Sequence, residues 1–155
     1  MQPNAIRKHI LAHWFGCGLV PRAPGTVGTL GAIPVHWLLT KISIFPHALV
    51  VLSITLVGFV VAQLAAKAVG DEDPGAVVID EVAGMLIAGW FVRDRGWPLL
   101  AVAFVLFRLL DITKPGIIDR AQRVGPPGVS IMLDDILAGL GAGMLSWLCG
   151  FALKL

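Results

Sequence analysis

The sequence is poor in charged residues, which make up only 14% of its 155 positions. Soluble domains are typically about 25% charged, whereas here hydrophobic residues reach 57% and the mean hydropathy is +0.84. This composition excludes an ordinary soluble domain and indicates an integral membrane protein. The net charge of +2, without any basic run interleaved with aromatic residues, also excludes nucleic acid as a partner.

The chain has only two cysteines and no internal repeat. Cys17 and Cys149 are too few for a disulfide framework, so we expect free thiols without a redox role. The four histidines are scattered without metal-ligand spacing. A chain of this length without repeats predicts a single domain over residues 1–155.

Five apolar stretches remain, and together they predict the fold. An all-α, compact, membrane-associated bundle of about five apolar helices is expected. Because a bilayer crossing takes about 20 residues, the first and third stretches are too short to span fully. The five are Val27–Leu39, Phe45–Ala66, Val82–Val92, Trp97–Leu110 and Ile136–Leu153.

Short links predict how these helices are arranged. Lys41–Ile44 and Arg93–Gly96 each leave room only for a tight reversal, so two antiparallel hairpins are expected. Asp80, Glu81, Asp111, Asp134 and Asp135 then fall at one membrane face, which we call the acidic face. Eight Lys and Arg residues lie at that face and four at the other. The positive-inside rule makes the acidic face cytoplasmic in a multi-pass protein. The cations are Arg7, Lys8, Arg22, Lys67, Arg108, Lys114, Arg120 and Arg123 on the first face, and Lys41, Arg93, Arg95 and Lys154 on the second.

Two acid pairs stand directly before apolar stretches. Asp80 and Glu81 precede Val82, and Asp134 and Asp135 precede Ile136, where we expect the fifth helix to start. A single acid there could simply complement the helix dipole or cap the helix. Two pairs on one face instead favour a divalent-cation site, since Mg²⁺ is usually held by one or two carboxylates with water and phosphate oxygens. These four acids are the predicted metal ligands.

Basic residues at the end of the fourth stretch point to an anion. Arg108 and Asp111 are spaced three apart, so a simple ion pair on one helical face is one interpretation. An arginine inside an apolar run is costly without an anion, which favours Arg108 and Lys114 as phosphate-binding residues. Asp111 would then orient one of them or bind the metal.

A glycine-rich segment lies before the first stretch. It includes Arg22, Gly25, Thr26 and Gly28, and we expect it to present backbone N–H groups to phosphate, with Arg22 as a further contact. Thr26 or Thr29 as a helix N-cap is the alternative. The segment has neither the Walker pattern nor a preceding strand. The polar turn at Asp71–Gly75 is equally consistent with a solvated loop, although Asp73 lies closer to Asp80.

The sequence resembles the phosphatidylglycerophosphatase A family from about Gly16 to Gly139. Four motifs carry the resemblance, in the same order along the chain. They are Gly16-x-Gly18 with Pro24-Gly25-Thr26-x-Gly28; Asp80-Glu81-x-x-Gly84-Met85; Phe107-Arg108-x-x-Asp111-x-x-Lys114-Pro115; and Ile131-Met132-x-Asp134-Asp135-x-x-Ala138-Gly139. Asp73-Pro74 stands where the family often has Asp-His.

The resemblance implies a bacterial inner-membrane enzyme of phospholipid synthesis. Its reaction would be the Mg²⁺-dependent hydrolysis of phosphatidylglycerophosphate to phosphatidylglycerol and phosphate. The catalytic acids would be Asp80, Glu81, Asp111, Asp134 and Asp135. Any of them could be the general base or the nucleophile. The non-enzymatic alternative is a small divalent-cation carrier or channel subunit, which would place its acids near mid-membrane.

Overall fold

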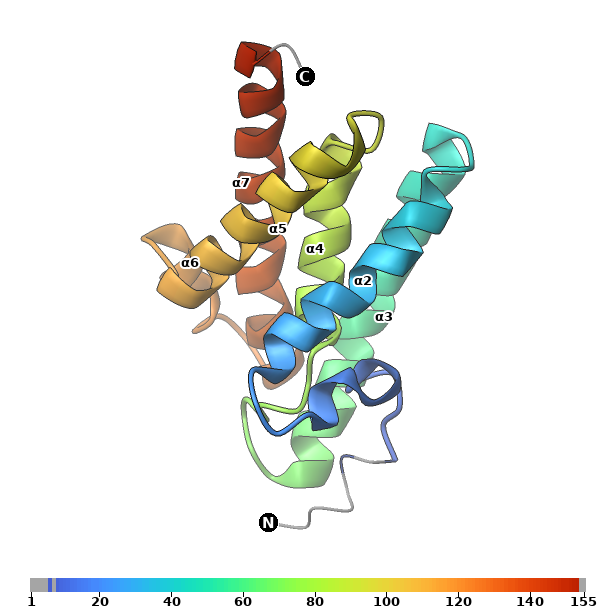
Figure 1. Cartoon of the computed structure of the whole chain (residues 1–155). Coiled ribbons are helices and arrows are strands. Elements are labelled where there is room, and N and C mark those ends of the chain that lie inside the picture. Colours follow the sequence, from blue (N-terminus) through green and yellow to red (C-terminus); the bar gives the residue numbers. More distant parts are fainter. Residues whose placement is uncertain (1–5, 7, 154–155) are drawn as a thin grey trace.

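The chain folds into a bundle of helices. The computed structural model describes residue 6 and residues 8–153, and all regular elements in that part are helical. The five apolar helices predicted from the sequence are all present, joined by two short additional ones (Figure 1). The elements are η1 (Trp14–Leu19), α2 (Pro24–Leu39), α3 (Ile44–Val69), α4 (Ile79–Phe91), α5 (Gly96–Thr113), α6 (Ile117–Ala121) and α7 (Pro127–Leu153).

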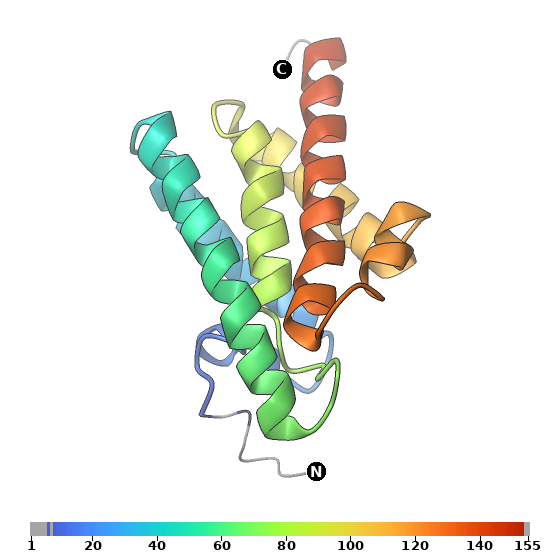
Figure 2. The same cartoon turned by 180° about the vertical axis from the view of Figure 1, so that it is seen from behind.

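Helix α4 is the centre of the bundle. It packs against α2, α3, α5 and α7, and Figure 2 shows it between α3 and α7. Most of its residues are buried, from Ile79 through Met85 to Gly89, because α4 is apolar on every face beyond its first turn. The largest buried side chain, Phe107 of α5, packs in the same core.

Within residues 8–153, three helices are long and apolar enough to cross a membrane: α3, α5 and α7. Leucines along α3, such as Leu49, Leu52 and Leu56, are exposed on the surface of the bundle, as expected for a lipid-facing helix. With 13 and 16 residues, α4 and α2 would extend only about 20 and 24 Å, short of the roughly 30 Å hydrocarbon core. The expectation that some helices are too short to span is confirmed.

Two helix starts differ from the prediction. The last helix begins at Pro127 rather than at Asp134–Asp135, so both acids lie two turns inside α7. Hydropathy located only the apolar part of this helix, whereas Pro127 sets its first turn. Similarly, α2 begins at Pro24, so Gly25, Thr26 and Gly28 are helical and do not form a loop. Neither threonine is the N-cap, because Ala23 occupies that position in a left-handed conformation.

Chain reversals place the key segments at one end of the bundle. The turns after α2 and α4 both lie at the end opposite the starts of α2, α4 and α7 (Figure 1). Arg7 and Lys154, which contributed to the count of cations on the two faces, lie outside the described residues. The acidic clusters therefore converge at the end of the bundle that holds η1 and α6.

Candidate active site

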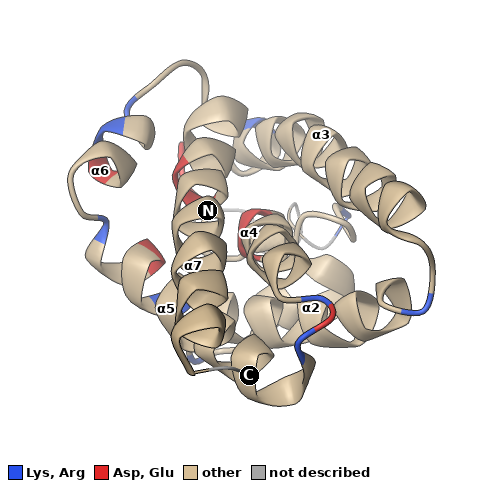
Figure 3. Cartoon of the chain, turned by 90° about the horizontal axis from the view of Figure 1, so that it is seen from above, with Lys and Arg blue, Asp and Glu red and all other residues tan. Residues whose placement is uncertain are grey.

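A pocket of about 520 Å³ opens at this end of the bundle. Its wall combines the start of α2, the segment before α4, the first turn of α4, the end of α5, and α7. Viewed along the bundle, acidic segments of α4, α5 and α7 lie around one side of the molecule (Figure 3). The pocket's volume is typical of a site for a small organic ligand rather than for a single ion.

Three carboxylates meet at the base of the pocket. One oxygen each from Asp80, Glu81 and Asp135 lies within 4.8 Å of the others, a spacing that could hold a metal ion. Asp80 and Glu81 occupy the first turn of α4, and Asp135 faces them from α7. The trio depends on close helix packing, since a Cβ on Gly139 would lie 2.3 Å from the carbonyl oxygen of Gly84.

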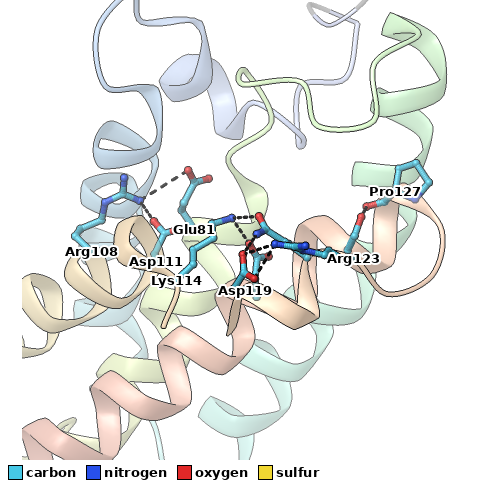
Figure 4. Close-up of polar contacts among 10 residues, drawn as sticks. Glu81, Arg108, Asp111, Lys114, Asp119, Arg123 and Pro127 are labelled. Carbon is cyan, nitrogen blue, oxygen red and sulfur yellow. Dashed lines mark hydrogen bonds and ion pairs between the residues drawn. The ribbon is translucent and has the colours of Figure 1, made fainter. Parts of the chain in front are cut away.

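Arg108 lies directly beside this trio. Its Nη1 donates a hydrogen bond to Asp111 Oδ2 at 2.5 Å and lies 3.8 Å from Glu81 Oε1 (Figure 4). Gly25 allows this approach, because a Cβ there would lie 2.1 Å from Glu81 Oε1 and 3.2 Å from Arg108 Nη1. The glycine in the first turn of α2 thus leaves room for the acid and the guanidinium.

Lys114 joins the pocket from the end of α5. It caps that helix in a left-handed conformation with φ of +43°. Its ammonium group donates hydrogen bonds to Asp134 Oδ2 and to Gln122 Oε1, the latter at 3.2 Å. Asp134 therefore pairs with a lysine and does not belong to the carboxylate trio.

Burial changes the pKa values of several ionisable groups in the pocket. Burial raises the pKa of the Asp80 carboxyl well above its ordinary value, and the charges of Glu81 and Asp135 raise it further. Burial also raises the pKa of Glu81, with the nearby Arg108 opposing the shift in part. For Lys114, burial alone would lower the pKa, but the hydrogen bond and charge of Asp134 outweigh it, so the pKa is raised.

The structure brings together most of the residues singled out in the sequence. Asp73 also lies at the pocket wall, whereas Arg22, Thr26 and Gly28 are not part of it. Arg22 is exposed, and Gly28 packs against Val78. The predicted residues in the wall are Gly25, Asp80, Glu81, Arg108, Asp111, Lys114, Asp134 and Asp135.

Sequence reasoning missed the contribution of the segment between α5 and α7. Gln122 and Arg123 of that segment line the pocket, and Ser130 lines it from the first turn of α7. Asp119 accepts hydrogen bonds from Gln122 at 2.6 Å and from Arg123 at 2.8 and 3.0 Å. The spacing of Asp119 and Arg123, four residues apart, was the signal that could have located a helix here.

Comparisons with known proteins agree with this arrangement of residues. A family model for phosphatidylglycerophosphatase A matches residues 10–149. Proteins named phosphatidylglycerophosphatase A from Escherichia coli and Haemophilus influenzae are 41% and 36% identical over 138 and 139 residues. These matches cover 88% and 86% of this chain and 80% and 83% of the relatives.

A third relative has a different name. A Bacteroides thetaiotaomicron protein, provisionally named a phosphatidylinositol-3-phosphatase, is 40% identical over 134 residues, covering 81% of this chain and 82% of that protein. No solved structure matches the chain. From the family model and the two relatives named above, the chain belongs to the phosphatidylglycerophosphatase A family of phosphoric monoester hydrolases.

Proposed function

We propose that the chain is a Mg²⁺-dependent phosphatidylglycerophosphatase of the bacterial inner membrane, with its pocket on the cytoplasmic side. The observation that supports this best is the trio of Asp80, Glu81 and Asp135 beside the cations Arg108 and Lys114 in one pocket. Oxygen ligands and a phosphate-binding cation are what hydrolysis of a phosphate monoester requires. The names of the curated relatives supply the substrate.

The donor set fits a hard divalent cation. Asp80 Oδ1, Glu81 Oε2 and Asp135 Oδ2 are buried and have no hydrogen-bond partner in the described part of the chain. Buried carboxylate oxygens without partners are costly, so a cation that satisfies them would stabilise the site. When bound, Mg²⁺ would supply charge neutralisation and activation of water.

Other residues of the pocket would bind the phosphoryl group and orient the residues that bind it. Arg108 and Lys114 would bind the phosphoryl oxygens, with Asp111 orienting Arg108 and Asp134 orienting Lys114. A carboxylate of the pocket would accept the proton of the attacking water. The bond from phosphorus to the glycerol oxygen then breaks, and that oxygen leaves as a hydroxyl after taking up a proton.

The proposed orientation of the protein in the membrane rests on its distribution of Lys and Arg residues. More Lys and Arg residues flank the pocket end than the other end, which favours the cytoplasmic side. The carrier alternative fits less well, because a carrier would place its acids near mid-membrane on several helices. Here they gather at one end beside Arg108 and Lys114.

A direct assay tests the proposal. Purified protein in neutral detergent is given phosphatidylglycerophosphate with and without Mg²⁺, and released phosphate is measured. We expect release only with metal, and a loss of at least 100-fold in Asp80→Asn and in Asp135→Asn. Asp71→Asn, at a position between α3 and α4 that does not line the pocket, is the matched control and should retain activity. Metal-independent release would refute the role of Mg²⁺, and no release by folded protein would refute the substrate.

A further inference from the structure

The outer part of the pocket is formed by residues that belong to none of the four motifs. Gln122 and Arg123 follow the short helix α6 and line the wall away from the carboxylate trio. Figure 4 shows Lys114 between Arg108 and Arg123, so that three cations follow one another across the site. Since Arg123 adds no contact to the trio, it requires a separate explanation.

The three cations differ in how they are paired. Arg108 and Lys114 each contact carboxylates whose side chains are at most 15% exposed. Arg123 pairs with Asp119 at the surface, and its side chain is 71% exposed. Both hydrogen bonds of the Arg123 side chain come from Nη2 and end on Asp119. A guanidinium has five N–H donors, so the pairing with Asp119 leaves Nη1 and Nε able to bind an anion.

The surroundings of Arg123 match the depth of lipid phosphates. Ile117 on α6 and Val124 next to Arg123 are both well exposed. Apolar side chains beside an exposed arginine are typical of a segment at the membrane interface, with the apolar groups in the acyl region and the charge at the headgroups. Arg123 therefore lies where the phosphodiester of a membrane lipid would be.

The chemistry of the substrate supplies the missing anion. This step rests on the proposed function. Phosphatidylglycerophosphate carries a phosphate monoester, which is cleaved, and a phosphate diester on the other side of its glycerol. A phosphatidylinositol 3-phosphate, the substrate in the name of the Bacteroides relative, also combines a monoester with a diester across a polyol. A pocket of about 520 Å³ has room for such a headgroup.

We propose that Arg123 is a specificity-determining residue that binds the phosphodiester of the substrate, while Arg108 and Lys114 bind the monoester. Asp119 holds Arg123 in place before the substrate arrives and competes with the diester for its guanidinium. An exposed salt bridge of this kind contributes little to stability, so releasing it costs little. Arg123 thereby distinguishes lipids that carry a diester from phosphatidate, which has a monoester alone.

Two inhibitors separate the two phosphate subsites. Hydrolysis of phosphatidylglycerophosphate is measured in neutral detergent, with dihexanoyl-phosphatidylglycerol or inorganic phosphate as the competitor. A charge-assisted hydrogen bond is worth about 1.5–3 kcal/mol, so Arg123→Gln should raise the Ki of the diester lipid about tenfold or more. The Ki of inorganic phosphate should stay within about twofold, because Arg108 and Lys114 are untouched.

The partner residue gives a prediction of opposite sign. Asp119→Asn removes the competing charge but keeps an acceptor for Gln122, so the Ki of the diester lipid should fall. Arg120→Gln, an exposed arginine on α6 outside the pocket, should change neither Ki. A purely structural salt bridge would instead make Arg123→Gln and Asp119→Asn behave alike.

Several outcomes would overturn the inference. Equal rises in both Ki values, no rise at all, or an effect that appears only when anionic lipid is added would each contradict a diester subsite. The last outcome would assign Arg123 to general attraction by the membrane surface. If Arg123→Gln does not fold, Arg123→Lys and Asp119→Asn decide the question. A wild-type protein that releases no phosphate refutes the proposed function instead, so the two failures are distinguishable.

Discussion

Among single residues, Lys114 combines a structural role with a proposed role in binding phosphate. It ends α5 in a left-handed conformation, contacts Gln122, and neutralises Asp134, which is almost completely buried. Removing one member of a buried ion pair leaves the other charge without compensation, which typically costs 3–5 kcal/mol. The contribution of Lys114 to stability is therefore separable from its proposed contact with phosphate.

A pair of variants tests this separation. We expect Lys114→Met to lower the free energy of unfolding by about 3 kcal/mol, because Asp134 loses its partner. Adding Asp134→Asn should restore most of that stability but none of the activity. Thermal unfolding in detergent and phosphate release are measured on the same samples. A single variant as stable as the wild type would contradict a structural role for the pair.

His36 gives a second prediction, at the opposite end of the bundle. It is buried in α2, close to Gly89, and its ring lies 5.8 Å from that of His47. Burial, together with the charges of His47 and Arg93, lowers the pKa of His36 from 6.5 to about 4. The folded protein thus keeps this ring neutral where an unfolded chain would protonate it.

The sign of the pH dependence follows directly. Below the unfolded pKa of 6.5 the unfolded state binds more protons, so stability should fall as the pH decreases from 6.5 towards about 4. Apparent melting temperatures across this range would show the loss, and His36→Gln should reduce it. His9→Gln, at a partly exposed position near the N-terminus, should leave the dependence unchanged. A variant at position 36 with the wild-type slope would contradict the assignment.

Among the helices, the contact of α4 with α7 determines the geometry of the site. Gly84 and Gly139 let the two backbones approach closely, and Asp135 lies about one turn before Gly139 on α7. A methyl group at position 139 would push the helices apart, since its contacts are with backbone atoms that cannot turn aside. Asp135 would then move away from Asp80 and Glu81.

Gly139→Ala tests that coupling. We expect a loss of about 2 kcal/mol in stability from overpacking. We also expect a Kd for Mn²⁺, measured by titration calorimetry, that is at least tenfold weaker. Gly141→Ala is the matched control, because its methyl group would meet only the flexible end of Leu110 at 3.2 Å. Unchanged Mn²⁺ affinity in a folded Gly139→Ala protein would show that the trio does not depend on this packing.

Elements with a strong sequence signal were predicted well. Hydropathy located all five apolar helices, and the short links after α2 and α4 placed Asp80, Asp111 and Asp135 at one end. The start of α7 was wrong, because its first turns, Pro127 to Ser130, contain too few apolar residues to stand out. Helix α6 was missed because a helix of five residues is too short to show a periodic pattern of apolar residues.

The spacing of Arg108 and Asp111 indicated their ion pair, but contacts between side chains of different helices could not be predicted from the sequence. Asp134 and Asp135 looked equivalent, yet they point in different directions on α7, one to Lys114 and the other to Asp80 and Glu81. Adjacent residues on a helix are about 100° apart, so helical geometry explains the division once both acids lie inside α7. The expected loop is helical because Pro24 starts α2, whereas its binding of phosphate stays a prediction.

On the scale of the whole molecule, the bundle has two unlike ends. One end holds the pocket, and the other holds the turns near Lys41 and Asp94. The proposed orientation places the pocket end in the cytoplasm. A residue at each end can therefore be modified with a chemical reagent independently of the other end.

Cysteine labelling checks that orientation. Cys17 and Cys149 are first replaced by serine, and then Glu72→Cys and Asp94→Cys are made separately at exposed loop positions. In intact cells with a permeable outer membrane, an impermeant maleimide should label the variant at position 94 only. Position 72 should react only after the inner membrane is opened. The reverse pattern would place the pocket on the periplasmic side.

The carboxylate trio also has a consequence for how the protein is made. Asp80 and Glu81 leave the ribosome well before Asp135, which lies in the last helix of the bundle. Until α7 has been synthesised and packed beside α4, the two earlier acids have no third carboxylate to meet. A nascent chain in the membrane therefore cannot assemble the site, and completion of the final helix is the step that makes it whole.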